Sequence, residues 1–149
     1  MAACQENSSE DALAQFIKPA QWEFLESYLQ PVPLAQAQVL ISKGANERSV
    51  YFIENGSLSV HYESESTPGR LRMAVVMAGS AVGEGGFFSH RPRNATVQAA
   101  SPCRVWVLTP IRFGELTNRQ PPIALALTLG LGALMSRRML DRRMRIAVT

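Results

Sequence analysis

Residues 83–100, GEGGFFSHRPRNATVQAA, hold the groups of this chain best suited to bind a charged ligand. Arg93 carries a planar guanidinium that stays charged and can pair with two phosphate oxygens at once. Gly83, Gly85 and Gly86 have no side chain, so a ligand can approach the backbone closely there. Successive backbone N–H groups at the start of a short helical turn would form a cradle for an anion.

Glu84 suits a different contact. Its carboxylate would repel a phosphate, but it accepts hydrogen bonds from a sugar hydroxyl or from a guanidinium. An acid, an accessible backbone and Arg93 in one small pocket are the groups that a phosphorylated sugar requires. The same residues also have a purely structural interpretation, a buried Glu84–Arg93 ion pair that closes a glycine-rich loop. Chemistry alone leaves both interpretations open.

Catalysis and metal binding are not indicated elsewhere in the sequence. We find no set of nucleophile, base and acid. The two cysteines, Cys4 and Cys103, and the two histidines have no metal-ligand spacing and give no disulfide framework. The first residues lack the basic region of a signal peptide, and no apolar run is as long as a membrane span. We therefore expect a cytoplasmic binding protein with no catalytic residues, no metal, no cofactor and no membrane span.

Hydrophobic periodicity predicts the elements that position these residues. The 149 residues suffice for one domain with its own core, residues 1–149. Helical spacing predicts helices over residues 9–30, the first capped by Ser9, and prolines then end the helical structure. Alternating apolar residues and turn signals over residues 32–109 predict a small antiparallel roll or sandwich. Asn55-Gly56 is its strongest hairpin signal.

Residues 110–146 return to a helical pattern. A short helix is expected first, and Pro121-Pro122 then open a long one that runs from Ile123 to about Arg145. Its first half is apolar almost all round, which exceeds what packing on one core requires. We expect this helix to be a homodimer surface and a lid over the ligand, with Thr128 and Ser136 nearest a base. The alternative is that the N-terminal helices cover the whole face within one chain.

The net charge of +3 conceals a basic cluster within the last thirteen residues, which comprises Arg137, Arg138, Arg142, Arg143 and Arg145. Such a cluster can attract nucleic acid or an anionic surface, or it can be a solvated helix end where cations suit the helix dipole. We expect these arginines to project into solvent. We expect no direct DNA binding, because no groove-reading motif accompanies them.

The order Gly83-Glu84 followed by Pro92-Arg93-x-Ala95-Thr96-Val97 resembles the phosphate-binding cassette of cyclic-nucleotide-binding domains. This family includes the bacterial catabolite activator protein and the regulatory subunit of cyclic-AMP-dependent protein kinase. Residues 39–44 and 50–60 resemble the family's ladder of β-roll turns, and residues 105–113 its last strand and following helix. The resemblance covers roughly residues 34–117. It implies an α+β fold, an antiparallel, jelly-roll-like β-roll flanked by N-terminal helices and a long C-terminal helix.

The resemblance also implies roles for single residues. Glu84 would accept from the ribose 2′-hydroxyl, Arg93 would pair with the cyclic phosphate, and the glycine amides would add phosphate contacts. Two positions depart from the family's pattern: Gly85 stands where a large aliphatic residue is usual, and Asn94 where Ala, Ser or Thr is usual. Asn94 could contact a base. The implied ligand-binding residues are Gly83, Glu84, Gly85, Gly86, Arg93, Asn94 and, on the far wall, Ala95 and Thr96.

These features predict a bacterial signalling module, a regulatory domain that binds cyclic AMP, or less readily cyclic GMP, and signals by rearranging its C-terminal helix. The family's transcription factors carry a helix-turn-helix after that helix, and this sequence contains none, so we expect either a stand-alone regulatory module or a fragment whose effector was removed. An effector protein of unknown identity is a further candidate partner. The alternative is a degenerate β-roll that binds no nucleotide and serves as a dimerisation or interaction module.

Overall fold

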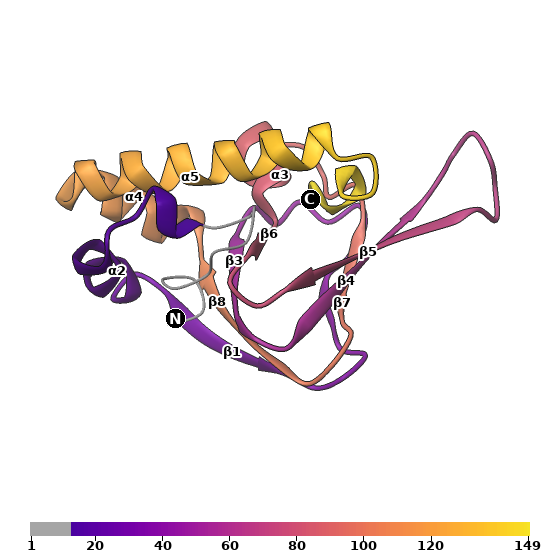
Figure 1. The fold of residues 1–149 in the computed structure, drawn as a ribbon, viewed down its shortest axis with the longest axis horizontal. Coiled ribbons are helices and arrows are strands. Elements are labelled where there is room, and N and C mark those ends of the chain that lie inside the picture. The colour runs from indigo at the N-terminus through magenta and orange to yellow at the C-terminus, as the bar shows by residue number, and fades with distance from the viewer. Residues whose placement is uncertain (1–12) are drawn as a thin grey trace.

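Two antiparallel four-stranded sheets fold over one another at the centre of the chain (Figure 1). The computed structural model describes residues 13–149, apart from the side chain of Ala14. The predicted antiparallel β-roll is confirmed. Sheet order is β1-β8-β3-β6 in one sheet and β2-β7-β4-β5 in the other. The strands are β1 Gln30–Leu34, β2 Val39–Ile41, β3 Val50–Asn55, β4 Ser57–Glu63, β5 Leu71–Met77, β6 Ala81–Val82, β7 Thr96–Ala99 and β8 Cys103–Leu108.

Strand β1 begins at Gln30, two residues before the predicted start of the roll, and it contains Pro31 and Pro33. Proline has no N–H to donate, so within a sheet it is confined to edge strands and bulges. The strand β1 lies at the edge of its sheet and pairs with β8 alone. The preceding helix, α2 Pro19–Glu26, already ends before the prolines, so the expectation that they end it is wrong, and both instead lie inside an edge strand that tolerates them.

The expected Asn55-Gly56 hairpin is not formed. Strands β3 and β4 adjoin this dipeptide but lie in different sheets, so the chain turns a corner from one sheet to the other. Gly56 has φ +76°, and a Cβ there would lie 2.5 Å from the Cβ of Cys103 and from the carbonyl oxygen of Pro102. The glycine is required by a close approach of two chain segments as well as by its backbone conformation.

The helices and 3-10 turns are η1 Leu13–Gln15, α2 Pro19–Glu26, α3 Glu84–Ser89, α4 Pro110–Arg119, α5 Pro121–Leu140 and η2 Arg145–Ala147. The helix start predicted at Ser9 lies outside the described residues. Helix α5 ends at Leu140, five residues before the predicted end. There the side chain of Asp141 accepts from the backbone N–H of Arg143 over 2.8 Å, a local bond that favours a turn over a further helical turn.

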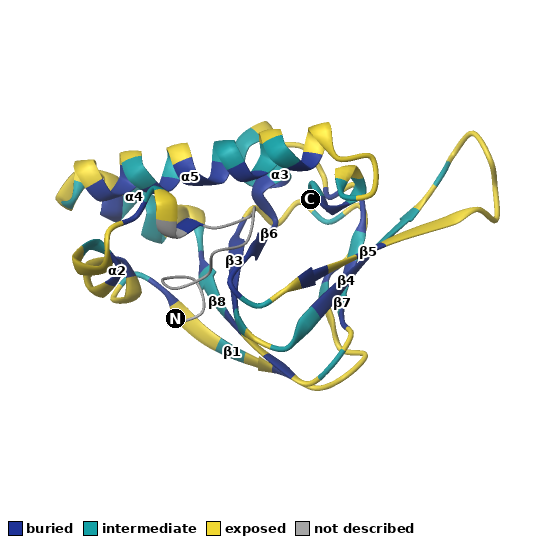
Figure 2. Ribbon diagram, in the orientation of Figure 1, coloured by how far each residue is buried: buried dark blue, intermediate teal, exposed yellow. Residues whose placement is uncertain are grey.

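Strand β3 is buried on both of its faces, one toward the interior of the roll and the other toward the helices, which include α5 (Figure 2). In β3, Phe52 packs into a cluster with the helices, whereas its neighbours Tyr51 and Ile53 face the interior of the roll. Helix α5 contributes one face to the helical cluster, which is formed by Ile123, Ala124, Leu127, Leu131 and Leu134. By length and composition alone α5 could cross a membrane, contrary to the expectation that no apolar run is long enough. Its packing on the roll accounts for the apolar character of this face.

Candidate functional site

Arg93 is held by its own backbone before its side chain makes any contact. Its N–H donates to the carbonyl oxygen of Ala45 over 2.8 Å, and its carbonyl oxygen accepts from the N–H of Gly44 over 2.7 Å. These bonds join the segment between α3 and β7 to the loop between β2 and β3. Arg93 as a whole is only 2% exposed, so the guanidinium lies inside the protein.

Four hydrogen bonds use the terminal nitrogens of the Arg93 guanidinium. Nη1 donates to the carbonyl oxygens of Gly83 over 2.7 Å and Thr149 over 3.0 Å. Nη2 donates to Oε2 of Glu47 over 2.8 Å and to the carbonyl oxygen of Ser49 over 2.6 Å. The acid paired with Arg93 is therefore Glu47, and the suggested Glu84–Arg93 ion pair is wrong. Sequence reasoning missed Glu47, since it lies 46 positions from Arg93 in an unremarkable polar loop.

The charge of Arg93 also acts on its neighbours. Burial tends to raise the pKa of Glu47, but hydrogen bonds from Ser49 and Arg93, together with the positive charge of Arg93, outweigh it, so this pKa lies below its ordinary value. Burial, with the negative charge of Glu47 next, raises the pKa of Tyr51 to about 12. Around neutral pH, Glu47 is thus ionised and Tyr51 is protonated beside the guanidinium.

Two of the glycines are required by the fit of Arg93. Gly83 has φ +92°, and a Cβ on it would lie 2.6 Å from the carbonyl oxygen of Ser49. A Cβ on Gly86 would lie 2.7 Å from Nη1 of Arg93. The short helix α3 begins directly after Gly83, as the expected helical turn through Phe87 and Phe88 requires. The guanidinium is therefore packed closely against the glycine backbone.

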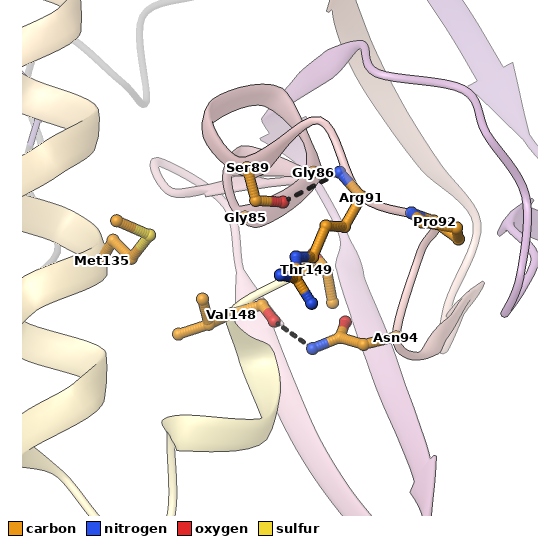
Figure 3. A pocket seen from close by; sticks show the side chains of 9 residues that line it. All are labelled: Gly85, Gly86, Ser89, Arg91, Pro92, Asn94, Met135, Val148 and Thr149. Atoms are coloured by element: carbon orange, nitrogen blue, oxygen red, sulfur yellow. Dashed lines mark hydrogen bonds between the residues drawn. The ribbon is translucent and has the colours of Figure 1, made fainter.

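The donors of the cradle converge on Thr149, which is 1% exposed. The N–H of Gly83 donates to its Oγ1 over 2.8 Å, and the N–H of Gly86 donates to its carbonyl oxygen over 2.9 Å. Arg93 bonds to the same carbonyl oxygen. In the neighbouring residue, the carbonyl oxygen of Val148 accepts from Nδ2 of Asn94 over 3.1 Å (Figure 3). Sequence reasoning gave no indication of this contact.

Glu84 is fully buried and pairs with Arg138 of α5, whose Nη1 donates to Oε1 over 2.9 Å. Arg138 also donates to Oγ of Ser80 over 2.9 Å and to the carbonyl oxygens of Ala81 and Ala147 over 2.7 and 3.2 Å. The expectation that all arginines from residue 137 onward project into solvent is wrong for Arg138. The sequence did contain a signal, because Arg138 follows Leu134 by four positions on the buried face of α5.

A cavity of about 290 Å³ opens beside Val148 and Thr149 (Figure 3). Asn94 and Gly85 line it together with Met135 of α5, whereas Ala95 is buried in the roll interior and the Oγ1 of Thr96 accepts from the N–H of Lys43. Neither Ala95 nor Thr96 lines this cavity. The two expected lid residues do not line it either: Thr128 borders a separate apolar pocket, and Ser136 is exposed.

Two other arginines of the cluster remain on the surface. Arg142 and Arg143 border a surface hollow with Arg70 and Arg72, at the start of β5. This hollow lies apart from the cassette, by which we mean residues 83–97. Four arginines therefore border one surface hollow.

The chain matches the family model of the cyclic nucleotide-binding domain over residues 31–120, and it belongs to this family. Among solved structures, it is similar to a cyclic nucleotide-binding domain from Methylobacillus flagellatus KT, with a TM-score of 0.76, 22% identity and coverage of 81% of this chain and 67% of that one. It is also similar to the N-terminal domain of a transcriptional regulator from Streptomyces coelicolor A3(2), with a TM-score of 0.72 and 25% identity. That match covers 93% of this chain and 90% of the other.

Thermus thermophilus catabolite activator protein is also similar, with a TM-score of 0.71 and 19% identity over 93% of this chain. The match spans 58% of that protein's length. A comparison with curated proteins gives no match. The family and the β-roll predicted from the sequence are thus confirmed.

Proposed function

We propose that this domain binds a cyclic purine nucleotide in its cassette and reports the binding through α5. One observation carries the proposal: the amides of Gly83 and Gly86 and the guanidinium of Arg93 all donate to two oxygens of a single residue, Thr149. Donors that converge on two neighbouring oxygens suit the two free oxygens of a cyclic phosphate. We propose a binding role for this site.

The arrangement of Arg93 supports a phosphate contact at one defined position. Three of its four terminal bonds, to Gly83, Ser49 and Glu47, fix the guanidinium in the loop framework. The fourth, to Thr149, is the one that a ligand oxygen can replace without unfolding the cassette. The ionised Glu47 holds the guanidinium plane in place. The phosphate would thus enter a site whose main donor is already oriented.

Glu84 would link ribose recognition to α5. A ribose 2′-hydroxyl that donates to the Glu84 carboxylate would compete with Arg138, which holds the end of α5 to the cassette. Weakening this bond would change the affinity of α5 for the roll, so that nucleotide binding and helix position become coupled. A ligand shifts such an equilibrium only by its difference in affinity for the two positions.

The cavity beside Asn94 and Met135 is where the base would lie. Its volume of about 290 Å³ is at the lower end of the range for small-ligand sites. Met135 offers an apolar contact from α5, and Asn94 can both donate to and accept from a base. We favour cyclic AMP over cyclic GMP because it is the commoner bacterial ligand. The setting we propose is the cytoplasm.

Helix α5 is also the surface through which we propose that two copies pair. Leu125 and Leu129 are 61% and 56% exposed, and space remains beside Gly132 for a second helix. The second candidate function, an interaction module that binds no nucleotide, is favoured by the occupation of the cradle by Thr149. In that case the cassette would be a structural clasp and the exposed face of α5 the working surface.

Titration calorimetry with cyclic AMP tests the proposed site. Arg93→Lys keeps the charge but loses the second nitrogen, so we expect at least about tenfold weaker binding, and Arg93→Ala should be weaker still. Arg112→Lys, in an exposed pair on α4, is the matched control and should bind as the unchanged protein does. Unchanged affinity in Arg93→Ala would mean that the phosphate is held elsewhere.

A further inference from the structure

The segment of residues 147–149, here called the inserted segment, is bonded to the cassette and α5 at each successive residue. The carbonyl oxygen of Ala147 accepts from Arg138, that of Val148 from Asn94, and that of Thr149 from both Gly86 and Arg93. Ala147 and Thr149 are almost wholly buried. A protein that binds a short peptide uses such backbone bonds for affinity and a side chain, here Thr149, for register.

The two positions where the cassette departs from its family's pattern both contact the inserted segment. Gly85 has no side chain, and a Cβ there would lie 3.0 Å from the carbonyl carbon of Thr149 and 3.3 Å from its nitrogen. A large aliphatic side chain at this position would therefore displace the segment. Asn94 supplies an amide donor, which Ala, Ser or Thr cannot supply, to the carbonyl oxygen of Val148. The contact with the inserted segment thus explains why each of these two positions holds an unusual residue.

The inserted segment and a nucleotide cannot use the same donors together. The N–H of Gly86 and the fourth bond of Arg93 are both taken by the carbonyl oxygen of Thr149. A phosphate oxygen bound there would occupy the position of that oxygen. The segment begins at the last residue of η2, and η2 packs against β4, β5 and α5. Its withdrawal would consequently disturb the end of α5 as well.

We infer that the cassette is a peptide-binding site and that the inserted segment is its resident ligand, which a cyclic nucleotide must displace. The claim that the cassette binds the inserted segment as a peptide does not depend on the proposed function. The claim that a cyclic nucleotide displaces the segment rests on it. Only the fraction of molecules whose cassette is empty can bind the nucleotide, and the apparent affinity is reduced in proportion to that fraction. The segment therefore sets the threshold concentration at which the domain responds.

Hydrogen–deuterium exchange and calorimetry on three variants test the inference. Gly85→Leu pushes the segment out of the cradle, and Thr149→Val removes the acceptor for the Gly83 N–H without changing the cassette. Gly114→Leu is the control, because it makes the same change in a helix where nothing lies within 4 Å of the new Cβ. We expect the amides of Gly83 and Gly86 to be protected in the nucleotide-free protein and in the control. In the first two variants they should exchange at least about tenfold faster, and cyclic AMP should bind about tenfold more tightly.

The results separate this inference from the proposed function. Amides of Gly83 and Gly86 that exchange freely in the unchanged protein would overturn the inference. The inference would also be overturned if all variants bound cyclic AMP with equal affinity and the inserted segment stayed protected from exchange while cyclic AMP was bound. Protected amides that lose protection in Gly85→Leu, with no cyclic nucleotide binding to any variant, would support the peptide site and overturn the proposed function.

Discussion

Arg138 donates to Glu84 across 2.9 Å, and both side chains are completely shielded from solvent. One partner opens the short helix of the cassette, and the other lies near the end of α5. The pair therefore connects the candidate ligand site directly with the helix that would transmit a signal. Its burial makes the connection sensitive to any change in either charge, because a charge removed from water is costly unless its partner is present.

Removing one member of this pair should destabilise the fold strongly. We expect Arg138→Met to lower the free energy of unfolding by about 3–5 kcal/mol, because Glu84 then remains buried without its cation. The double variant Arg138→Met/Glu84→Gln should lose much less than the sum of the two single variants. Urea denaturation measures all three.

The exposed pair Arg112–Glu115 provides the control for this prediction. Its two side chains are each 41% exposed, so Arg112→Met should cost less than about 1 kcal/mol. An Arg138→Met protein as stable as Arg112→Met would show that the buried pair does not hold α5 to the cassette.

Two glycines with similar backbone conformations should respond differently to alanine. Gly69, at φ +83°, would have nothing within 4 Å of an added Cβ, so Gly69→Ala should cost only the conformational strain of about 1 kcal/mol. Gly56→Ala adds a collision with Cys103 and Pro102 and should cost roughly 1–3 kcal/mol more. Thermal unfolding gives the comparison. Equal losses would mean that the corner at Gly56 relaxes easily.

Local patterns in the sequence predicted much of the fold. The alternation in residues such as Leu58 and Val60 predicts strands, and Pro121-Pro122 marks the start of α5. The sequence could not show which strands pair. Asn55-Gly56 satisfies the local requirements of a hairpin, but the choice between a hairpin and a corner depends on whether β4 finds its partners in β5 and β7.

The sequence predicted only the part of the candidate site that depends on local patterns. Arg93 and the glycines stand close together in the chain, so their types and spacing are informative. Glu47 and Arg138 reach the cassette from distant positions, and their types are common on protein surfaces. Only the helical register of Arg138 with Leu134 indicated burial. The position of Thr149 depends on tertiary packing alone.

Acid should weaken the fold partly through Glu47. The pKa of Glu47 is lowered in the folded protein, so the unfolded chain binds the proton more readily. The stability that Glu47 contributes is therefore present above its ordinary pKa of 4.5 and is lost as the pH falls through the lowered pKa. We expect Glu47→Gln to be less stable at neutral pH and to lose less stability on acidification. Denaturation at a series of pH values checks this. Parallel pH profiles for the two proteins would contradict the assignment.

The exposed face of α5 should mediate pairing of two chains. Leu129→Glu places a charge on this face without entering the core, so we expect it to shift a dimer toward monomer with little loss of stability. Light scattering at high micromolar concentration measures the mass, with Ile111→Glu, an exposed apolar site on α4, as the control. An unchanged protein that stays monomeric with and without nucleotide would defeat the dimer proposal.

Thermal unfolding with cyclic AMP, cyclic GMP and 5′-AMP tests the central claim, that the domain binds a cyclic nucleotide, most directly. A ligand at about a hundred times its dissociation constant should add roughly 2.7 kcal/mol, which for a domain of this size raises the midpoint by roughly 5–10 °C. We expect that rise with a cyclic nucleotide, cyclic AMP above cyclic GMP, and none with 5′-AMP. No shift with any cyclic nucleotide at millimolar concentration would contradict the proposed function.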